Sequence, residues 1–284
     1  MAVKISPLSQ VHPRTELGDN VEIGPFCLVG ANVTINDRTK LDSHVTIVGH
    51  TNIGARNRFF PNCVIGAEPQ DVSYQDSGTR LEIGDDNIFR EGATINRGAE
   101  KEDHCTWIGN RNVFMANSHV AHNCRIGNGV ILVNGVLLGG HVHVHDSAIV
   151  SGNSVIHHYS TLGTLCFVSG GCRAPHDVPP YMLAVGSDKP EIKSINIVGM
   201  RRAGIPEKTI SVIKQTHRLI FREHKTVDAI RCIFSEELAG VFPFELTALL
   251  NAFENQQRGR FGRTREPERQ SEASAAGTSE RRAA

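Results

Sequence analysis

Bulky apolar residues recur at every sixth position through the first two-thirds of the chain. From Ile5 to Ile65 all eleven positions in this frame are Ile, Val, Leu or Phe, and the pattern continues to Val168. Residues 71–82 interrupt the pattern, and an insertion at 101–107 shifts its frame. A short fixed period with one apolar anchor is typical of a solenoid, because each repeat buries its apolar face against its neighbours.

The six-residue period, with glycine often second, predicts an all-β solenoid: a left-handed parallel β-helix of hexapeptide repeats. Each hexad would supply one short strand and a corner, and three hexads would close one triangular coil. Coils would stack about 4.8 Å apart. The first residue of a hexad points inward, and the fifth is an inward site for a small side chain. Cysteines at the fifth position are interpreted as small buried hydrophobes: Cys27, Cys63, Cys124, Cys166 and Cys172.

After Pro190 the apolar period becomes helical. Helices are expected after Pro206, over about 227–238 and after Pro243. From about Gln256 the chain has few apolar residues, which predicts disorder. The domains expected are a hexapeptide-repeat domain (1–189) with loops at 71–82 and 101–107, a small α-helical C-terminal domain (190–257) and a disordered tail (258–284).

Charge and composition narrow the class of protein. Lys+Arg and Asp+Glu balance at 30 each, which gives no reason to expect nucleic acid or a membrane surface as partner. The chain has no 18-residue apolar run, and its first residues lack a signal-peptide core, so we expect a cytoplasmic protein without a transmembrane segment. The seven cysteines form no C-x-x-C pair, which indicates neither a disulfide framework nor a zinc knuckle.

Histidines gather on one outward face of the predicted prism. His122 is third in its hexad, His141 is fourth in a later one, and the hexads concerned start 18 residues apart, so they stack in successive coils over roughly 10 Å. His119 ends the preceding hexad, so we expect it at the adjoining corner, with His122 mid-strand. The column consists of His119, His122, His141, His157 and His158.

Three interpretations of this column remain open from the repeat alone. The histidines could be solvated turn residues. They could bind zinc, since His119, His122 and His141 offer three imidazoles and the γ-class carbonic anhydrases bind zinc on such a prism, although with different ligand spacing. They could also act in acid/base catalysis, because imidazole titrates near neutral pH and suits proton removal from a sugar hydroxyl.

An ordered set of motifs is more specific than the repeat. The chain reads H-V-A-H-N-C at 119–124, L-G-G-H-V-H-V at 138–144, V-I-H-H-Y at 155–159 and D-V-P-P-Y at 177–181. It also carries P-Q-D-x-x-Y at 69–74 and I-N-R-G at 95–98. Together these motifs resemble the UDP-N-acetylglucosamine 3-O-acyltransferases, the first enzymes of lipid A biosynthesis, over about residues 5–255.

The resemblance implies a role for each matching residue. His122 would be the general base on the glucosamine 3-hydroxyl of UDP-N-acetylglucosamine, and the Gly140 N–H would stabilise the oxyanion. The donor would be acyl carrier protein bearing a 3-hydroxyacyl chain, and neither a cofactor nor a metal is implied. Family members are homotrimers with active sites between subunits. The substrate-binding residues implied are Asp71, His119, His141, His157, His158, Gly170 (acyl length), Asn196 and Arg202.

Four residues depart from the family pattern: Ser73, Asn123, Val198 and Ala203. They leave open a variant acceptor such as a 3-amino sugar nucleotide. The N-acyltransferase that acts later in the pathway carries an extra N-terminal domain, for which we expect no room before Ile5. Acetyl-CoA-dependent sugar acetyltransferases usually lack a helical domain like 190–255. A non-enzymatic or metal-binding solenoid remains the alternative outside acyl transfer.

Overall fold

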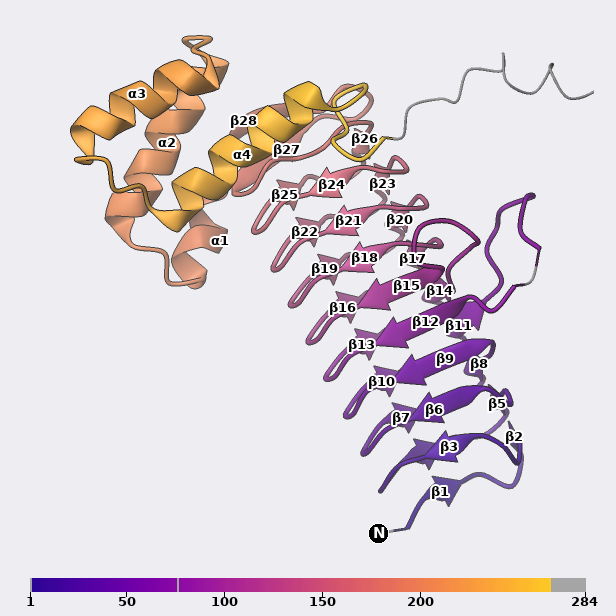
Figure 1. Ribbon diagram of the computed structural model, residues 1–284. Coiled ribbons are helices and arrows are strands. Elements are labelled where there is room, and N and C mark those ends of the chain that lie inside the picture. Colours follow the sequence, from indigo (N-terminus) through magenta and orange to yellow (C-terminus); the bar gives the residue numbers. More distant parts are fainter. Residues whose placement is uncertain (1, 76, 267–284) are drawn as a thin grey trace, which may run out of the picture.

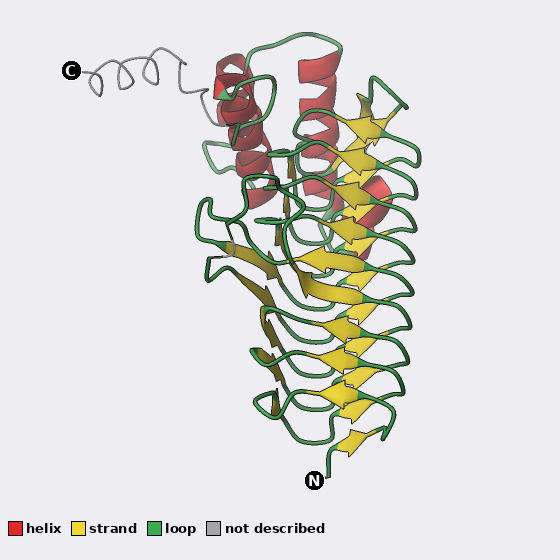
Figure 2. Ribbon diagram, turned by 90° about the vertical axis from the view of Figure 1, so that its right-hand side faces the viewer, coloured by secondary structure: helices red, strands yellow, loops and turns green. Residues whose placement is uncertain are grey.

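The computed structural model describes residues 2–75 and 77–266 as a triangular prism of stacked coils with helices at the end far from the N-terminus (Figures 1 and 2). Three sheets, here called faces A, B and C, form its sides, and their strands pair in parallel except for β28 at the end of face A. Each strand pairs with the equivalent strand of the next coil, as Val120 does with Leu138 and Leu138 with Ile156. The predicted hexapeptide β-helix is therefore confirmed.

The strands are short and follow the hexads. Face A contains β1 (Lys4–Ile5), β4 (Glu22–Ile23), β7 (Lys40–Leu41), β10 (Arg58–Phe59), β13 (Ile88–Phe89), β16 (Val113–Phe114), β19 (Ile131–Leu132), β22 (Ile149–Val150), β25 (Phe167–Val168), β27 (Met182–Val185) and β28 (Glu191–Ile195). Face B contains β2 (Gln10–Val11), β5 (Leu28–Val29), β8 (Thr46–Ile47), β11 (Val64–Ala67), β14 (Thr94–Asn96), β17 (His119–Val120), β20 (Leu137–Leu138), β23 (Val155–Ile156) and β26 (Arg173–Ala174). Face C contains β3 (Glu16–Leu17), β6 (Val33–Ile35), β9 (His50–Ile53), β12 (Arg80–Ile83), β15 (Cys105–Ile108), β18 (Arg125–Ile126), β21 (His143–Val144) and β24 (Thr161–Leu162).

The core is a set of ladders along the prism axis. First-position residues of successive coils stack directly, as Phe59, Phe89 and Phe114 do, with ring centroids 4.6 and 4.7 Å apart and the rings nearly parallel. The five fifth-position cysteines are buried, as predicted. Burial raises the pKa of Cys124 to about 12, which keeps this thiol protonated and unreactive.

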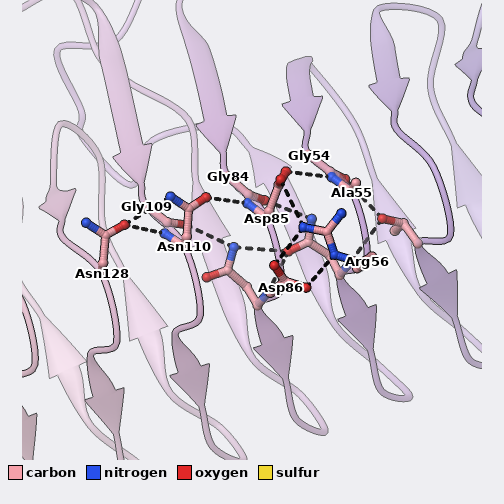
Figure 3. Close-up of polar contacts among 12 residues, drawn as sticks. Gly54, Ala55, Arg56, Gly84, Asp85, Asp86, Gly109, Asn110 and Asn128 are labelled. Carbon is pink, nitrogen blue, oxygen red and sulfur yellow. Dashed lines mark hydrogen bonds and ion pairs between the residues drawn. The ribbon is translucent and has the colours of Figure 1, made fainter.

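A ladder of polar side chains explains why glycine is so often the second residue of a hexad (Figure 3). Asn110 Oδ1 accepts a hydrogen bond from the Asp85 backbone N–H at 2.7 Å, and Asn128 Oδ1 accepts one from the Asn110 N–H at 2.9 Å. A Cβ atom at Gly84 would lie 2.3 Å from Asn110 Oδ1, and one at Gly109 would lie 2.8 Å from Asn128 Oδ1. The side chain of the coil above occupies this space, so only glycine fits.

The two predicted loops are shorter than expected. Residues 80–82 and 105–107, assigned to loops from the sequence, belong to the strands β12 and β15. The assignment was wrong there because strand pairing on face C is longer at this level: β12 pairs over four residues with both β9 and β15. Residues 68–79 and 97–104 lie between strands and face the same corner of the prism as the histidines.

The C-terminal helices agree with the helical period. The helices are α1 (Ile197–Arg202), α2 (Glu207–Phe221), α3 (Val227–Glu237) and α4 (Phe244–Arg258). Pro206 and Pro243 precede α2 and α4, as predicted, whereas α1 and the antiparallel hairpin β27–β28 were not predicted. β28 extends face A across the proposed boundary at residue 190. None of the helices in the described part of the chain combines the length and apolar character that crossing a bilayer requires.

The start of the predicted disordered tail is folded. Residues 258–266 end α4 and return to the prism, where Arg263 is 6% exposed and donates a hydrogen bond to the Pro175 carbonyl. The prediction was wrong for these residues because composition does not reveal hydrogen bonds to a distant turn. Residues 267–284, the rest of that prediction, lie outside the described residues.

Candidate active site

One corner of the prism, between faces B and C, carries the predicted histidines. We call it the histidine corner: the turns at residues 121–124, 139–142 and 157–160, which follow β17, β20 and β23. The turns are hydrogen-bonded to one another, with the His141 N–H donating to the His122 carbonyl at 3.0 Å and the Tyr159 N–H to the Gly140 carbonyl at 3.1 Å. The expected stacking of three successive coils is confirmed.

The expected places of His119 and His122 were reversed. His119 lies in strand β17, and His122 lies in the turn that follows it. The reason is that each strand covers the last residue of one hexad and the first of the next, and Asn123, with φ 56°, forms the turn. His119 Nδ1 lies 2.8 Å from Thr94 Oγ1, and burial lowers its pKa, with the nearby His122 as a further cause.

Asn123 orients the imidazole of His122. Asn123 Oδ1 lies 2.9 Å from His122 Nδ1 and also accepts a hydrogen bond from the Ala99 N–H at 2.8 Å, while Asn123 Nδ2 donates to the Lys101 carbonyl at 2.7 Å. These bonds fix which amide atom faces the imidazole. Since Oδ1 is an acceptor, His122 Nδ1 carries the proton, and the lone pair is on Nε2, which is the arrangement a general base needs.

Asp71 and Lys101 form an ion pair beside the imidazole of His122. Asp71 Oδ2 lies 4.0 Å from His122 Nε2 and 2.7 Å from Lys101 Nζ, and the N–H and hydroxyl of Ser73 both donate to Asp71 Oδ1. The bond from Lys101, followed by those from Ser73, holds the pKa of Asp71 well below its usual range. Lys101, which belongs to the inserted segment, thus supplies a cation beside Asp71.

His141 is the most enclosed histidine of the corner, with 3% of its surface exposed. Its ring stacks on Tyr159 at a centroid distance of 4.3 Å and meets the His122 ring edge-on at 5.2 Å. Its Nδ1 lies 3.4 Å from a carboxylate oxygen of Glu102. Burial, with the nearby charge of His122 as the next cause, lowers the pKa of His141 to about 3, so this imidazole is neutral at ordinary pH.

Gly140 lies directly under the imidazole of His122. A Cβ atom at Gly140 would be 2.8 Å from His122 Cε1 and 2.9 Å from its Nε2. Glycine is therefore required by the ring packed against it. The residue expected to stabilise an oxyanion is thus next to the nitrogen expected to take the proton.

The structure does not bring every predicted residue to this corner. Gly170 lies in the turn between β25 and β26, at the corner between faces A and B. Asn196 caps α1, accepting from the Gly199 N–H at 2.9 Å and donating to the Leu165 carbonyl at 2.9 Å, and Arg202 is exposed at the end of α1. Figure 1 shows α1 on the left, beyond the β25 edge of the prism, whereas β17 lies on the right.

Among the described residues, one group could hold a metal ion: His157, His158 and Glu266, whose ligand atoms lie within 4.8 Å of one another. Glu266 already pairs with Arg263 at 2.8 Å, and His157 Nδ1 lies 3.0 Å from the His158 carbonyl. His119, His122 and His141, the three imidazoles considered for zinc, are not part of this group. The three imidazoles considered for zinc therefore do not gather as a metal site among the described residues.

Sequence reasoning missed three residues of this corner: Lys101, Glu102 and Arg265. Lys101 and Glu102 fall in the loop predicted at 101–107, and loops on a rigid scaffold often carry functional residues, which is the one signal that the sequence offers for them. Arg265 gave no signal, because it lies within the segment 258–284, whose composition predicts disorder.

Exchanging Asn123 for aspartate tests how the base is held. In Asn123→Asp the new carboxylate favours the imidazolium form of His122, so the acidic limb of kcat against pH should move to higher pH. The variant also loses the amide donor to the Lys101 carbonyl in a fully buried site, which should lower the free energy of unfolding by about 1–3 kcal/mol. A pH profile and a denaturant titration check both effects, and an unchanged profile would contradict contact between this side chain and the base.

Two family models match the chain: "Udp N-acetylglucosamine O-acyltransferase; Domain 2" over residues 177–261 and "Bacterial transferase hexapeptide (six repeats)" over residues 105–140. Acyl-[acyl-carrier-protein]–UDP-N-acetylglucosamine O-acyltransferases are similar over most of their length. That of Sinorhizobium fredii is 40% identical over 80% of this chain and 84% of its own. That of Pseudomonas putida is 38% identical over 90% of this chain and 98% of its own.

Solved structures agree. The UDP-N-acetylglucosamine acyltransferase LpxA of Bacteroides fragilis superposes with a TM-score of 0.83 at 36% identity, covering 88% of this chain and 97% of its own. LpxA of Acinetobacter baumannii gives a TM-score of 0.83 at 36% identity, over 88% and 96%. With identities near 40% over four-fifths or more of the chain, this protein belongs to the acyl-[acyl-carrier-protein]–UDP-N-acetylglucosamine O-acyltransferase family.

Proposed function

We propose that this enzyme transfers a 3-hydroxyacyl chain from acyl carrier protein to the glucosamine 3-hydroxyl of UDP-N-acetylglucosamine, the first step of lipid A biosynthesis. The observation that carries the proposal is the pairing of an oriented imidazole with an adjacent glycine turn: His122 Nδ1 is engaged by Asn123, and the ring, with Nε2, packs against Gly140. Both substrates belong to the cytoplasm, where we place the reaction.

The geometry suits each proton transfer. His122 Nε2 takes the proton of the 3-hydroxyl as its oxygen attacks the thioester carbonyl carbon. The negative charge moves to the carbonyl oxygen, which the Gly140 N–H stabilises. When the tetrahedral intermediate collapses, the carbon–sulfur bond breaks, and the imidazolium returns the proton to the departing thiolate. Asn123 keeps Nδ1 protonated throughout, so His122 can only act through Nε2.

The charged groups around the base suit a sugar nucleotide. Lys101 is half exposed and offers a cation near the base, and Asp71 is held ionised beside it. His141 is neutral, and among the described residues its ring nitrogens form no hydrogen bond, with Nδ1 3.4 Å from Glu102. We assign Asp71, His119, His141 and the pair His157 and His158 to binding the acceptor.

A cationic cleft on the helical domain fits an acidic donor protein. Lys193, Lys214, Arg218 and Arg222 line a cleft of about 460 Å³, with the last three spaced by one helical turn along one side of α2. Opposite charge speeds the encounter of two proteins and fixes their orientation. We propose that acyl carrier protein docks here.

The product identifies the reaction. Incubating the enzyme with UDP-N-acetylglucosamine and a set of 3-hydroxyacyl carrier proteins should give an ester-linked 3-O-acyl product, detected by mass spectrometry. A 3-amino sugar nucleotide, tested in parallel, would give an amide. An amide alone would replace the acceptor with the amino sugar, and the absence of both products would refute acyl transfer.

We further propose a homotrimer whose active sites lie between subunits. Gly170, Asn196 and Arg202 lie away from the histidine corner of their own chain, although the resemblance assigns all of them to one substrate site. Gly170 lies at one edge of face A, and Asn196 lies at the other edge, beside Leu165 between β24 and β25. A second copy that places its face A against the histidine corner would unite the two groups. This arrangement explains why the histidine column faces outward.

Mixed oligomers test the shared site. His122→Ala disables one corner and Arg202→Glu, by reversing a charge near the nucleotide, disables the other. Co-expressed with separable tags, the two variants should form mixed oligomers with sites whose corners are both intact, so activity should exceed that of either variant alone by several-fold. Activity no greater than the sum of the separate variants would place both groups in one subunit's site.

A further inference from the structure

The segment after α4, residues 259–266, forms what we call the C-terminal strap, which follows the histidine corner. The Asp177 N–H donates to the Gly262 carbonyl at 2.9 Å, and the Asp177 carboxylate accepts from the Thr264 N–H at 2.7 Å. His176 Nδ1 lies 2.7 Å from the Phe261 carbonyl. Figure 1 shows the strap, in yellow, returning beside β26. Backbone groups of the strap are therefore bonded to His176 and Asp177, which belong to the coil next to the histidine turns.

The strap ends on the active-site turn. Arg265 donates from Nη1 to the His141 carbonyl and from Nη2 to a Glu102 carboxylate oxygen at 2.6 Å. The other oxygen of Glu102 lies 3.4 Å from His141 Nδ1. The Arg265 side chain is only 21% exposed, so these charge-assisted bonds are partly shielded from water.

Three segments distant in sequence thus meet at one turn. The inserted segment supplies Glu102, the strap supplies Arg265, and both contact His141, which forms its turn with φ 63°. The preceding residue of the same turn is Gly140, on which the His122 ring lies. Movement of the His141 carbonyl would therefore move the Gly140 peptide relative to the base.

We propose that Arg265 is a positioning residue for acyl transfer: it clamps the turn at residues 139–142 and Glu102, and so sets Gly140 and His141 in place beneath the base. The inference rests on the proposed function. Arg265 lies beyond residue 261, where the match to the family model ends, so the role follows from this chain's own contacts. Arginine suits it, because the planar guanidinium reaches a carbonyl and a carboxylate at once.

Kinetics of the full-length Arg265→Met variant test the clamp. The variant should lose about tenfold in kcat and gain a few-fold in KM for UDP-N-acetylglucosamine, because a small misplacement of reacting groups is costly. Arg265→Lys should recover part of the loss, since lysine can reach one partner but not both. The matched control is Arg260→Met, whose side chain lies over Phe261 within the same strap and should behave as wild type.

Two measurements separate positioning from general stability. Hydrogen exchange of the peptide covering residues 139–142 should accelerate in Arg265→Met and not in Arg260→Met. Glu102→Gln combined with Arg265→Met should lose little more kcat than Arg265→Met alone, because one clamp is broken in both.

Each remaining outcome decides against the clamp. Wild-type kinetics in Arg265→Met would overturn it. Equal losses in Arg265→Met and Arg260→Met, with the same fall in Tm, would show that the strap only adds stability. If the unmodified enzyme gives no acylated product, the proposed function fails. Hydrogen exchange then still tests the clamp: exchange at residues 139–142 that is the same in Arg265→Met and in the wild type would refute it.

Discussion

His122→Ala should lower kcat by at least about 10²-fold, the low end for loss of a general base. Its Nε2 is the ring nitrogen without a proton, because Nδ1 is engaged by Asn123 Oδ1 at 2.9 Å. Alanine removes the base and leaves the Asn123 bond to the Ala99 N–H in place, so the fold of the corner should persist. KM for UDP-N-acetylglucosamine should change little. Steady-state kinetics and direct binding of the sugar nucleotide measure the two effects separately.

His119→Ala is the matched comparison. His119 lies three residues before His122, in β17, and its Nδ1 is bound to Thr94. The His119→Ala variant should weaken sugar-nucleotide binding more than it lowers kcat. Near-wild-type turnover in His122→Ala would refute the catalytic role and return the histidine column to a structural or metal-binding interpretation. A larger kcat loss in His119→Ala than in His122→Ala would exchange the two roles.

The prism was predictable because its physics is local and periodic. An inward position recurs every six residues, only apolar side chains are tolerated there, and Phe59, Phe89 and Phe114 show the resulting ladder. Second-position glycines such as Gly54, Gly84 and Gly127 follow from the same repetition, since each faces a side chain of the next coil. The period also placed His122 and His141 in neighbouring coils, a contact between residues 19 positions apart that no local propensity indicates.

What the period could not predict depends on contacts between segments with no repeat. Lys101 and Asp71 form an ion pair between two loops. Neither loop follows the six-residue repeat, so the repeat cannot predict that these two residues meet. Arg265 reaches His141 over 124 positions, from a segment whose composition indicates disorder. The reversal of His119 and His122 has a smaller cause: a hexad fixes the repeat, but not which of its residues form the two-residue strand.

Gly140→Ala should reduce kcat by about 10²-fold while leaving the fold intact. The added Cβ would lie 2.8 Å from His122 Cε1 and 2.9 Å from Nε2, closer than such atoms approach, so either the imidazole or the turn must move. A displacement approaching 1 Å between reacting groups is enough to lower kcat by about 10²-fold. The backbone at Gly140 is not in the left-handed region, so alanine adds no backbone strain, and the loss should come from the clash that displaces the base.

Comparing kcat with stability makes this prediction specific. Tm of Gly140→Ala should stay close to that of the wild type, in contrast to a substitution that damages the prism. Gly30→Ala is the control, because its Cβ would meet its nearest atom, the Val48 Cα, at an ordinary 3.5 Å, and both kcat and Tm should be unchanged. If Gly140→Ala keeps wild-type turnover, the imidazole is free to move without loss. The close contact between this glycine and His122 would then have no part in placing the base over the oxyanion site.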